Sequence, residues 1–355
     1  FYNTYKTILH WKDNKVHGQM GQSRTVTRRF APSDPNLAQL PKKGEGVKFR
    51  ECYVPHHKDA VVASIDFKGQ ELRQGAGQSM DENMLSCFVG DNLRDMHSMT
   101  AAGAMEKKWG KTALAEMIER FGKPGDTEYD LFTRLHELVE DEAVAKMADD
   151  LRKVAKNVNF GAQYDAMAPK LAETLIIPVA DAQAFLEAKF AMFPRFEEWK
   201  EEVKAEIGRL GYVTTCMGAR RHLREAILSD NKWDIEKAMR QGPNFRIQGS
   251  SAEQTKLAMA RVWRSGVLWK YDVVFFAPIH DELVFSVHRD HALEVIKIFH
   301  DAMVEPYGNL PVPFLGSISL GPNFGKQYEA GDWYIEENIK EILAKIFSGE
   351  VAEVV

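Results

Sequence analysis

The chain has 355 residues, of which 45% are hydrophobic and 27% charged, a balance typical of soluble globular proteins. This length provides for about two domains, and no stretch approaches the roughly 20 apolar residues of a membrane span. The three scattered cysteines fit neither a disulfide framework nor a zinc site, and with no signal peptide they predict a cytoplasmic protein. The net charge of −5 argues weakly against nucleic acid as a partner, but residues 1–50 hold ten Lys/Arg against three Asp/Glu, which can form a local phosphate-binding surface.

The first part of the chain predicts short elements joined by turns. Residues 16–30 are polar and basic and alternate like a strand. Three prolines within residues 29–41 make a helix implausible and favour a fixed, turn-rich loop. The apolar run of residues 61–65 predicts a buried strand with Asp66 at its exit. Helical patterns follow over residues 82–89 and 95–105.

A basic and aromatic helix is predicted near the middle of the chain, after two helices within residues 106–150. There Arg152, Lys156, Phe160 and Tyr164 recur every four residues and therefore share one helix face. Arg152 and Lys156 are like charges that repel at this spacing, so the pattern suggests an anion that both residues bind. A nucleotide would fit, with its phosphates on the cationic half and its sugar and base on the two rings. The alternative is a solvated basic face that continues into core aromatic residues.

The second half of the chain predicts helices followed by a strand hairpin and a closing helix and strand. Residues 273–279 and 283–287 are apolar runs that flank the polar turn His280-Asp281-Glu282, which is typical of a hairpin with acids at its tip. The remaining predicted elements are helices over 180–192, 195–209, 231–240, 244–264 and 291–304, a hairpin over 212–222, and a strand over 313–319.

Two aspartates, Asp66 and Asp281, each lie at the edge of a buried apolar strand. Taken singly, such a residue is usually a turn former. Brought together, two carboxylates repel unless cations lie between them. Magnesium suits the position because it takes oxygen ligands, needs only one or two protein carboxylates and leaves room for substrate phosphates. Two such ions about 3.5–4 Å apart would bind both the attacking and the leaving oxygen of an in-line phosphoryl transfer.

Four sequence patterns, taken together, resemble the family A DNA polymerases, the class of bacterial DNA polymerase I and many phage replicases. The resemblance covers roughly residues 12–325, and phage-type members are the expected relatives. The matching patterns are Asp66-x-x-x-x-Glu71-Leu72-Arg73 (motif A), Arg152-x-x-x-Lys156-x-x-x-Phe160-Gly161-x-x-Tyr164 (motif B), His280-Asp281-Glu282 (motif C), and Arg29 with Ser33-Asp34-Pro35-Asn36-Leu37; Asn244-x-x-x-Gln248-Gly249 matches as well.

The resemblance implies a role for each matching charged residue. Asp66 and Asp281 would hold two Mg²⁺ ions, with Mn²⁺ as an alternative, and Glu282 would be the nearby carboxylate. Arg152 and Lys156 would hold the triphosphate of an incoming dNTP. Lys156 could also donate a proton to the leaving pyrophosphate.

Further matching positions imply contacts to the rest of the nucleotide. Phe160 would stack near the sugar, and Tyr164 would lie beside the templating base. Glu71 would crowd a ribose 2′-hydroxyl and so favour deoxynucleotides. His97 resembles a family histidine near the phosphates.

Five positions would contact primer-template DNA. Arg29, Asn244, Gln248 and His280 would touch the primer end and the minor-groove side of the new base pair, where acceptors are nearly independent of sequence. Arg240 resembles an arginine that contacts the template.

The implied fold is α+β, with an antiparallel palm sheet and mainly helical fingers, and with the thumb largely absent. We expect a separate chain or a missing N-terminal part to supply the thumb and exonuclease, so that this chain has no proofreading activity and poor processivity alone. The implied regions are 1–28 (end of thumb and entry to palm), 29–80 (palm), 81–230 (fingers, with an expected insertion at 106–150 and the motif B helix at 151–165), 231–325 (palm) and 326–355 (acidic tail helix).

Several residues depart from the family pattern. Gly69 and Gln70 replace the usual Gln-Ile before Glu71, which alters polar support around the sugar. Asp165 stands where the family usually has Gly. The stretch 106–150 is longer than the usual connection, and the apolar stripe of the tail suggests a helix that packs on its own domain or, alternatively, docks a partner.

Two rival functions fit parts of the pattern. A single-subunit RNA polymerase would keep the chemistry, but Glu71 and the Glu282 that follows Asp281 argue against it. A non-catalytic DNA-binding subunit would keep the fold, but the intact acidic and basic motif residues disfavour it. Comparison of rNTP with dNTP incorporation and primer extension by aspartate variants would separate these functions.

Overall fold

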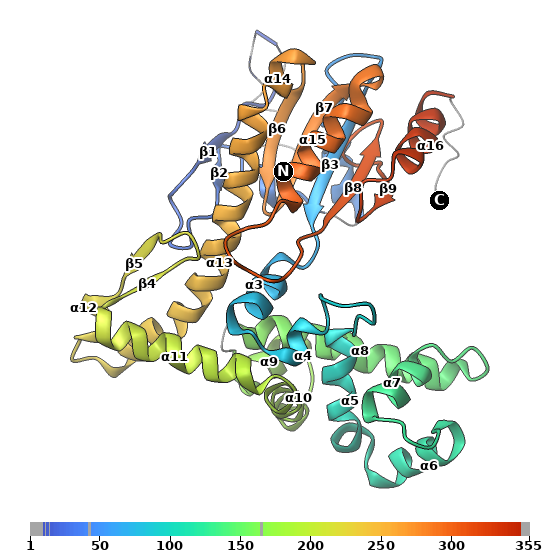
Figure 1. Ribbon diagram of the computed structural model, residues 1–355, viewed down its shortest axis with the longest axis vertical. Coiled ribbons are helices and arrows are strands. Elements are labelled where there is room, and N and C mark those ends of the chain that lie inside the picture. The colour runs from blue at the N-terminus through green and yellow to red at the C-terminus, as the bar shows by residue number, and fades with distance from the viewer. Residues whose placement is uncertain (1–9, 11, 14, 42–43, 164–165, 349–355) are drawn as a thin grey trace. The chain divides into compact units, whose positions relative to one another are not determined.

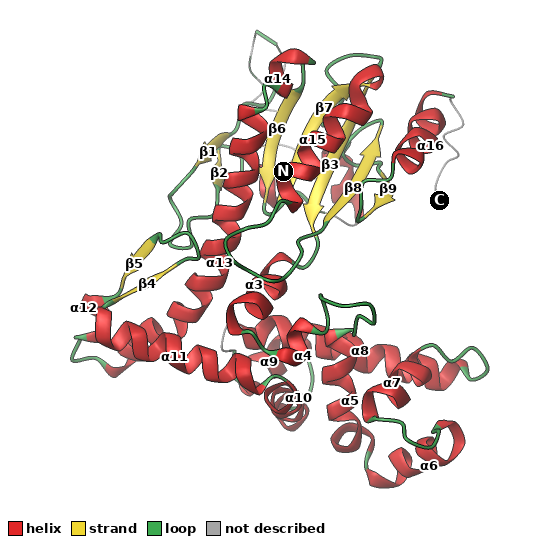
Figure 2. Ribbon diagram, in the orientation of Figure 1, coloured by secondary structure: helices red, strands yellow, loops and turns green. Residues whose placement is uncertain are grey.

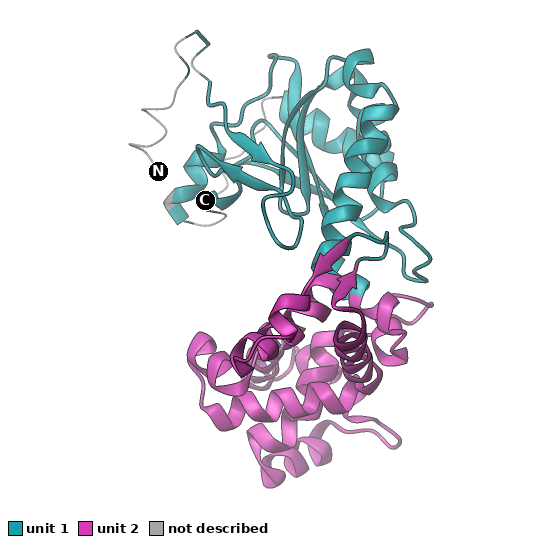
Figure 3. Cartoon of the chain, turned by 90° about the vertical axis from the view of Figure 1, so that its left-hand side faces the viewer, with its two compact units in different colours: residues 1–74, 215–219, 247–355 teal, residues 75–214, 220–246 magenta. Residues whose placement is uncertain are grey.

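A computed structural model describes residues 10–348 except 11, 14, 42–43 and 164–165. The chain forms two compact units (Figure 3). The first unit comprises residues 1–74, 215–219 and 247–355, and the second comprises residues 75–214 and 220–246. Among the described residues, no helix combines the length and the apolar character that crossing a bilayer requires.

A five-stranded antiparallel sheet is the centre of the first unit (Figure 2). Its strand order is β6-β7-β3-β8-β9, so two segments far apart in the chain, β3 and the β6–β7 hairpin, are neighbours. The five strands are β3 (Ala60–Phe67), β6 (Val274–Ile279), β7 (Glu282–His288), β8 (Gly316–Gly321) and β9 (Tyr328–Gly331). Strand β3 is buried on both faces because it is central and apolar throughout.

Each face of this sheet is covered by a separate group of side chains. Helix α15 (Ala292–Val304) and the C-terminal part of α13 (Lys232–Arg264) pack on one face through residues such as Phe299 and Val262. The opposite face is covered by irregular segments that contribute Tyr53 and Phe324. Smaller elements complete the unit: β1 (Gln19–Gly21), β2 (Ala31–Ser33), α2 (Val47–Arg50), α14 (Val267–Lys270) and the 3-10 turns Leu37–Gln39, Gly44–Gly46 and Arg289–His291.

The C-terminal stripe forms helix α16 (Glu336–Phe347), which packs on its own unit (Figure 1). Ile339 is fully buried and Phe347 is partly buried against the main core of the sheet. The predicted packing of the tail on its own domain is therefore confirmed. The sequence reading missed strand β9, which joins the sheet edge just before this helix.

The second unit is mainly helical, as expected. Its apolar core is formed by α5, α7, α8 and α10, with Phe132, Leu151 and Phe185 among the buried residues. The elements are α4 (Glu82–Leu85), α5 (Met96–Trp109), α6 (Lys111–Phe121), α7 (Glu128–His136), α8 (Glu142–Gln163), α9 (Ala168–Leu175), α10 (Val179–Met192), α11 (Pro194–Leu210), α12 (Arg224–Ile227) and the hairpin β4 (Tyr212–Thr214) and β5 (Arg220–His222). Helix α3 (Gln70–Ser79) runs from the first unit into the second.

Four predicted elements were wrong in their extent. The two helices predicted over 231–240 and 244–264 are one helix, α13, with Pro243 inside it. Proline usually breaks a helix because it lacks an N–H and clashes with the preceding turn, but burial of Ala238 and Phe245 on either side holds this helix together. The strand predicted over 16–30 is reduced to β1, and the helix predicted over 82–89 is only α4.

Candidate active site

The ends of two neighbouring strands bring the motif A and motif C acids together. Asp66, at the end of β3, lies directly opposite Glu282, the first residue of β7. The backbone N–H of Phe67 donates to the carbonyl oxygen of Asp281 at 3.4 Å. His280 and Asp281 form the two-residue turn between β6 and β7, and His280 adopts the left-handed φ of 60° that such turns require. The sheet register therefore places the backbones of Asp66 and Asp281 close together at one end of the sheet.

The donor set at these strand ends fits a hard divalent cation. Asp66 and Asp281 supply carboxylate oxygens, which Mg²⁺ and Mn²⁺ prefer. The two groups of three ligand atoms that lie close enough to hold an ion are elsewhere among the described residues, at His10, Asp13 and His17 and at His57, Asp59 and His288. Asp66 and Asp281 belong to neither group.

A buried arginine lies within electrostatic range of the same acids. Arg50 is only 7% exposed, its guanidinium donates to the Leu40 carbonyl at 3.2 Å, and it lies 4.5 Å from the centre of the Phe324 ring. Burial lowers its pKa, while Glu282 and Asp66 act in the opposite direction. Glu282 is itself 7% exposed, so the sheet carries an internal cation beside its acids.

Glu71 forms an ion pair with Arg29 in the first unit. Burial raises the pKa of the Glu71 carboxyl, and the nearby Asp281 raises it further, while Arg29 and a hydrogen bond from Gln248 oppose this. Three other predicted site residues from three separate chain segments, Arg29, Gln248 and Asp281, therefore act on the Glu71 carboxylate. Arg29, His280 and Asp281 also line one small hollow.

The departure at Gln70 has a structural explanation. Its side-chain amide donates to the backbone carbonyl of Ser251 at 3.2 Å and to Oε1 of Gln254 at 3.1 Å. Gln70 is 3% exposed, so it ties the start of α3 to α13. The preceding Gly69 has a φ of 61°, which glycine adopts without steric cost.

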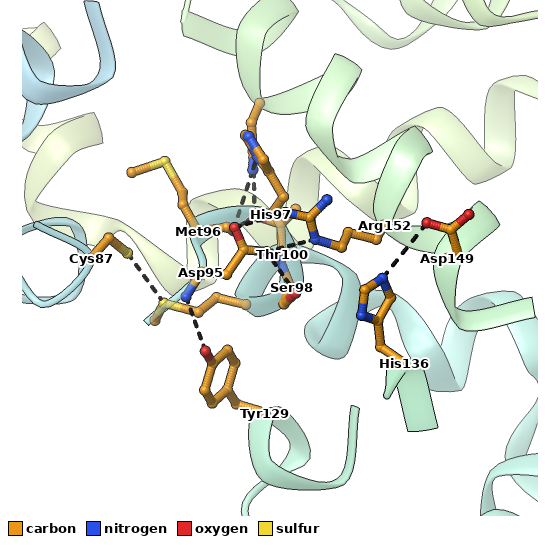
Figure 4. Close-up of polar contacts among 12 residues, drawn as sticks. Cys87, Asp95, Met96, His97, Ser98, Thr100, Tyr129, His136, Asp149 and Arg152 are labelled. Atoms are coloured by element: carbon orange, nitrogen blue, oxygen red, sulfur yellow. Dashed lines mark hydrogen bonds and ion pairs between the residues drawn. The ribbon is translucent and has the colours of Figure 1, made fainter. Parts of the chain in front are cut away.

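In the second unit, Arg152 forms a two-point ion pair with Asp95 (Figure 4). The Nε–H of Arg152 donates to Oδ2 of Asp95 at 2.8 Å, and Nη2 donates to Oδ1 at 3.0 Å. Asp95 also caps helix α5 by accepting from the backbone N–H of Ser98 at 2.8 Å and from its hydroxyl at 2.6 Å. Burial alone would raise the pKa of the Asp95 carboxyl, but the bonds from Arg152 and Ser98 outweigh it and lower the pKa.

His97 is held as a neutral ring beside these cations. Its Nδ1 lies 3.1 Å from the side-chain nitrogen of Asn159, and since that amide nitrogen is only a donor, Nδ1 accepts and the proton lies on Nε2. Oδ1 of Asn159 accepts from the Thr100 hydroxyl at 2.9 Å. Burial lowers the pKa of His97 to about 4; Asp95 opposes this, whereas Arg152 and Lys156 lower it further. The imidazole is therefore an uncharged hydrogen-bond donor at neutral pH.

The remaining motif B residues follow along α8. Lys156 is exposed, one turn beyond Arg152. The ring of Phe160 lies against that of His97, with 5.9 Å between centroids. The predicted roles of Tyr164 and Asp165 fall outside the described residues.

The two other predicted DNA contacts lie on α13. Arg240 and Asn244 are both half-buried. The side-chain oxygen of Asn244 is buried and has no hydrogen-bond partner among the described residues, which is a costly state for a polar atom.

Sequence reasoning missed three residues that shape these sites. Arg50 and Asn159 are buried polar residues, and Asp95 was noted only as a neighbour of His97. A helix-capping aspartate followed three residues later by Ser98 is a usable signal for the cap, but the pairing of Asp95 with Arg152 spans 57 positions and has no local signature.

The chain is similar to known DNA polymerases. The family model described as DNA polymerase family A matches residues 1–114 and 112–326. The chain is 30% identical over 318 residues to the thermostable DNA polymerase I of Thermus aquaticus, which covers 89% of this chain and 33% of that protein. It is 29% identical over 313 residues to DNA polymerase I of Bacillus subtilis, covering 88% of this chain and 31% of that protein.

The fold is similar to that of a solved polymerase structure. The POL domain of Pol1 from M. smegmatis, in complex with DNA primer-template and dNTP, superposes with a TM-score of 0.72 and 24% identity, covering 91% of this chain and 50% of that one. The chain spans about a third of the length of the curated relatives described above. Because the family model covers most of its length, the chain belongs to DNA polymerase family A.

Proposed function

We propose that the chain catalyses template-directed DNA synthesis, adding dNTPs to a primer 3′ end with release of pyrophosphate. The observation that carries the proposal is the register of β3 against β7, which makes Asp66 and Asp281 neighbours at one end of the sheet. Such a pair has little use in a binding subunit, because like charges side by side destabilise a fold that leaves them uncompensated.

Asp66 and Asp281 hold two divalent ions in this proposal, Mg²⁺ or alternatively Mn²⁺. When bound, such ions stabilise negative charge on the transferring phosphoryl group. The chain itself binds and orients the substrates. In this proposal residues 29–80 and 231–325 form the palm and residues 81–230 form the fingers, and the motif residues have the roles that the resemblance implies.

In the second unit, Arg152, Lys156 and the Nε2–H of His97 bind the triphosphate. Neutral His97 suits this role because its Nε2–H can donate a hydrogen bond to a phosphate oxygen. Lys156 donates a proton to the leaving pyrophosphate, Phe160 contacts the sugar and Tyr164 the templating base.

In the first unit, Glu71 excludes a ribose 2′-hydroxyl, and its pair with Arg29 holds it in place. Arg29, Gln248 and His280 contact the primer end. On the part of α13 that belongs to the second unit, Asn244 contacts the new base pair and Arg240 contacts the template.

We further propose that segments beyond this chain, in the same polypeptide or another, supply the thumb and the proofreading exonuclease. The share of its relatives that the chain spans supports this. The activity is placed in the cytoplasm, or in the host cytoplasm if the gene is of phage type, and the free cysteines Cys52, Cys87 and Cys216 are consistent with a reducing compartment.

Primer extension with aspartate variants tests the proposal. Asp66→Asn and Asp281→Asn keep side-chain size but remove the charge, and each should lower extension by at least about a hundredfold and weaken Mn²⁺ binding measured by electron paramagnetic resonance. Asp290→Asn, an exposed acid beyond the far end of β7, is the matched control and should change neither.

The outcomes distinguish the proposed function from the two alternatives, an RNA polymerase and a non-catalytic DNA-binding subunit. Extension with rNTPs at the same efficiency as with dNTPs would favour an RNA polymerase. Failure of the wild-type chain to extend a primer while it binds the DNA would favour a non-catalytic subunit. Loss of a mismatched primer end during the assay would contradict the predicted lack of proofreading.

A further inference from the structure

The stretch between α5 and α8 forms a helical segment whose side chains make many fixed contacts. Helix α7 begins with a reciprocal capping box between Thr127 and Asp130. Arg134 closes the preceding loop by donating to Asp126 and to the Phe121 carbonyl at 2.6 Å. Phe132 and Leu135 are completely buried in the core of the second unit. Because these contacts fix its own position, the segment can hold the residues that it contacts in fixed positions.

Helix α7 contacts both helices that carry the Asp95–Arg152 pair. The backbone N–H of Asp95 donates to the hydroxyl oxygen of Tyr129 at 2.9 Å (Figure 4). The guanidinium of the adjacent Arg94 lies 5.5 Å from the centre of the Tyr129 ring. At the other end of α7, Nε2 of His136 lies 3.6 Å from Oδ1 of Asp149, three residues before Arg152 on α8.

The ion pair between Asp95 and Arg152 leaves some N–H groups of the Arg152 guanidinium able to bind an anion. Arg152 uses Nε–H and one N–H of Nη2 to bind Asp95. A guanidinium has five N–H donors in a fixed plane, so the Nη1 group and the second N–H of Nη2 form a remaining fork. Such a fork matches the geometry of a phosphate. Asp95 therefore orients Arg152 through one edge without occupying the edge that would receive an anion.

We propose that α7 is a positioning element for nucleotide binding, in which Tyr129 fixes Asp95 and Asp95 aims Arg152 at the triphosphate. The inference rests on the proposed function of Arg152. Asp95 is the N-cap of α5, so its N–H lies outside the helical hydrogen bonds and depends on Tyr129 for a protein partner. The Tyr129 hydroxyl on α7 thus gives the backbone N–H of Asp95 a fixed acceptor in place of solvent.

A double-mutant cycle on the full chain tests this inference. Tyr129→Phe removes one oxygen and Asp95→Asn keeps a capping side chain while removing the charge. Tyr129→Phe should weaken equilibrium dATP binding, measured by tryptophan fluorescence with Ca²⁺, and raise the KM for dATP, each about fivefold, with kcat and primer-template affinity unchanged. Asp95→Asn should have an effect of about tenfold, and Tyr129→Phe should add nothing to it.

Tyr212→Phe is the matched control, because Tyr212 is a half-buried tyrosine of the same unit that lies on the β4–β5 hairpin, and it should match the wild type. Thermal melting of every variant separates a local effect from unfolding. Unchanged dATP binding in a folded Tyr129→Phe variant, or an equal loss on the Asp95→Asn background, would overturn the inference. Normal dATP binding without primer extension by the wild type would instead contradict the proposed function.

Discussion

Charged side chains are arranged differently in the two units. At the strand ends of the first unit, Asp66, Asp281 and Glu282 are concentrated within one turn and the facing strand, with Arg50 buried nearby. In the second unit, Arg152 is already matched to Asp95 by two hydrogen bonds. Carboxylates that lie close together can bind cations, which relieve their mutual repulsion. An arginine paired with a carboxylate has less charge left for a ligand, but its orientation is fixed. The first arrangement suits metal binding and the second suits placement of a phosphate.

The largest effect that would sharpen this comparison is expected at Arg50. Arg50→Met keeps the apolar volume but leaves Glu282 buried without its neighbouring cation, so the free energy of unfolding should fall by about 3 kcal/mol. Arg289→Met, at a side chain that is 47% exposed, should cost less than about 1 kcal/mol. Urea denaturation of both variants measures the difference, and equal losses would show that Arg50 does not compensate the acids.

A smaller effect should appear in the pH dependence of the second unit. Because the pKa of His97 is about 4 when folded and about 6.5 when unfolded, the unfolded chain binds more protons between these values. Stability should therefore fall as pH drops from 6.5 towards 4, with a contribution from His97 of about 2 kcal/mol.

The difference between the wild type and His97→Gln isolates this contribution, because other groups titrate equally in both proteins. Urea midpoints measured between pH 7 and 4.5 should fall less steeply for the variant. Parallel curves would mean that His97 is not held neutral by burial.

The smallest expected effect concerns the shape of the cation at position 152. Arg152→Lys retains the charge but loses the planar fork that binds Asp95 through one edge. The KM for dNTPs should rise about tenfold while the melting temperature changes little. Lys153→Arg, on an exposed face of the same helix, is the control; no change in KM for Arg152→Lys would show that charge alone suffices there.

Much of the local structure around the candidate residues could be predicted from the sequence. The buried strand ending at Asp66, the hairpin with His280 and Asp281 in its turn, and the amphipathic helix carrying Arg152 all follow from periodicity and turn chemistry, which depend on residues close in the chain. Membership in family A followed from the order and spacing of the motifs, and the family comparison confirmed it. The extent of α13 could not be predicted, because burial on both sides of Pro243 overrides a local signal.

The sequence by itself determined which residue types stand at strand ends and along the face of α8, since backbone geometry repeats over a few residues. Only the tertiary structure decided the partners: Arg29 with Glu71, 42 positions apart, Arg152 with Asp95, and Tyr129 with the backbone of Asp95. Such pairs depend on how helices and strands pack together. Periodic patterns in a single sequence report local structure and do not indicate contacts between distant residues. The same reason explains why the contact between Tyr129 on α7 and the backbone of Asp95 could not be predicted from the sequence.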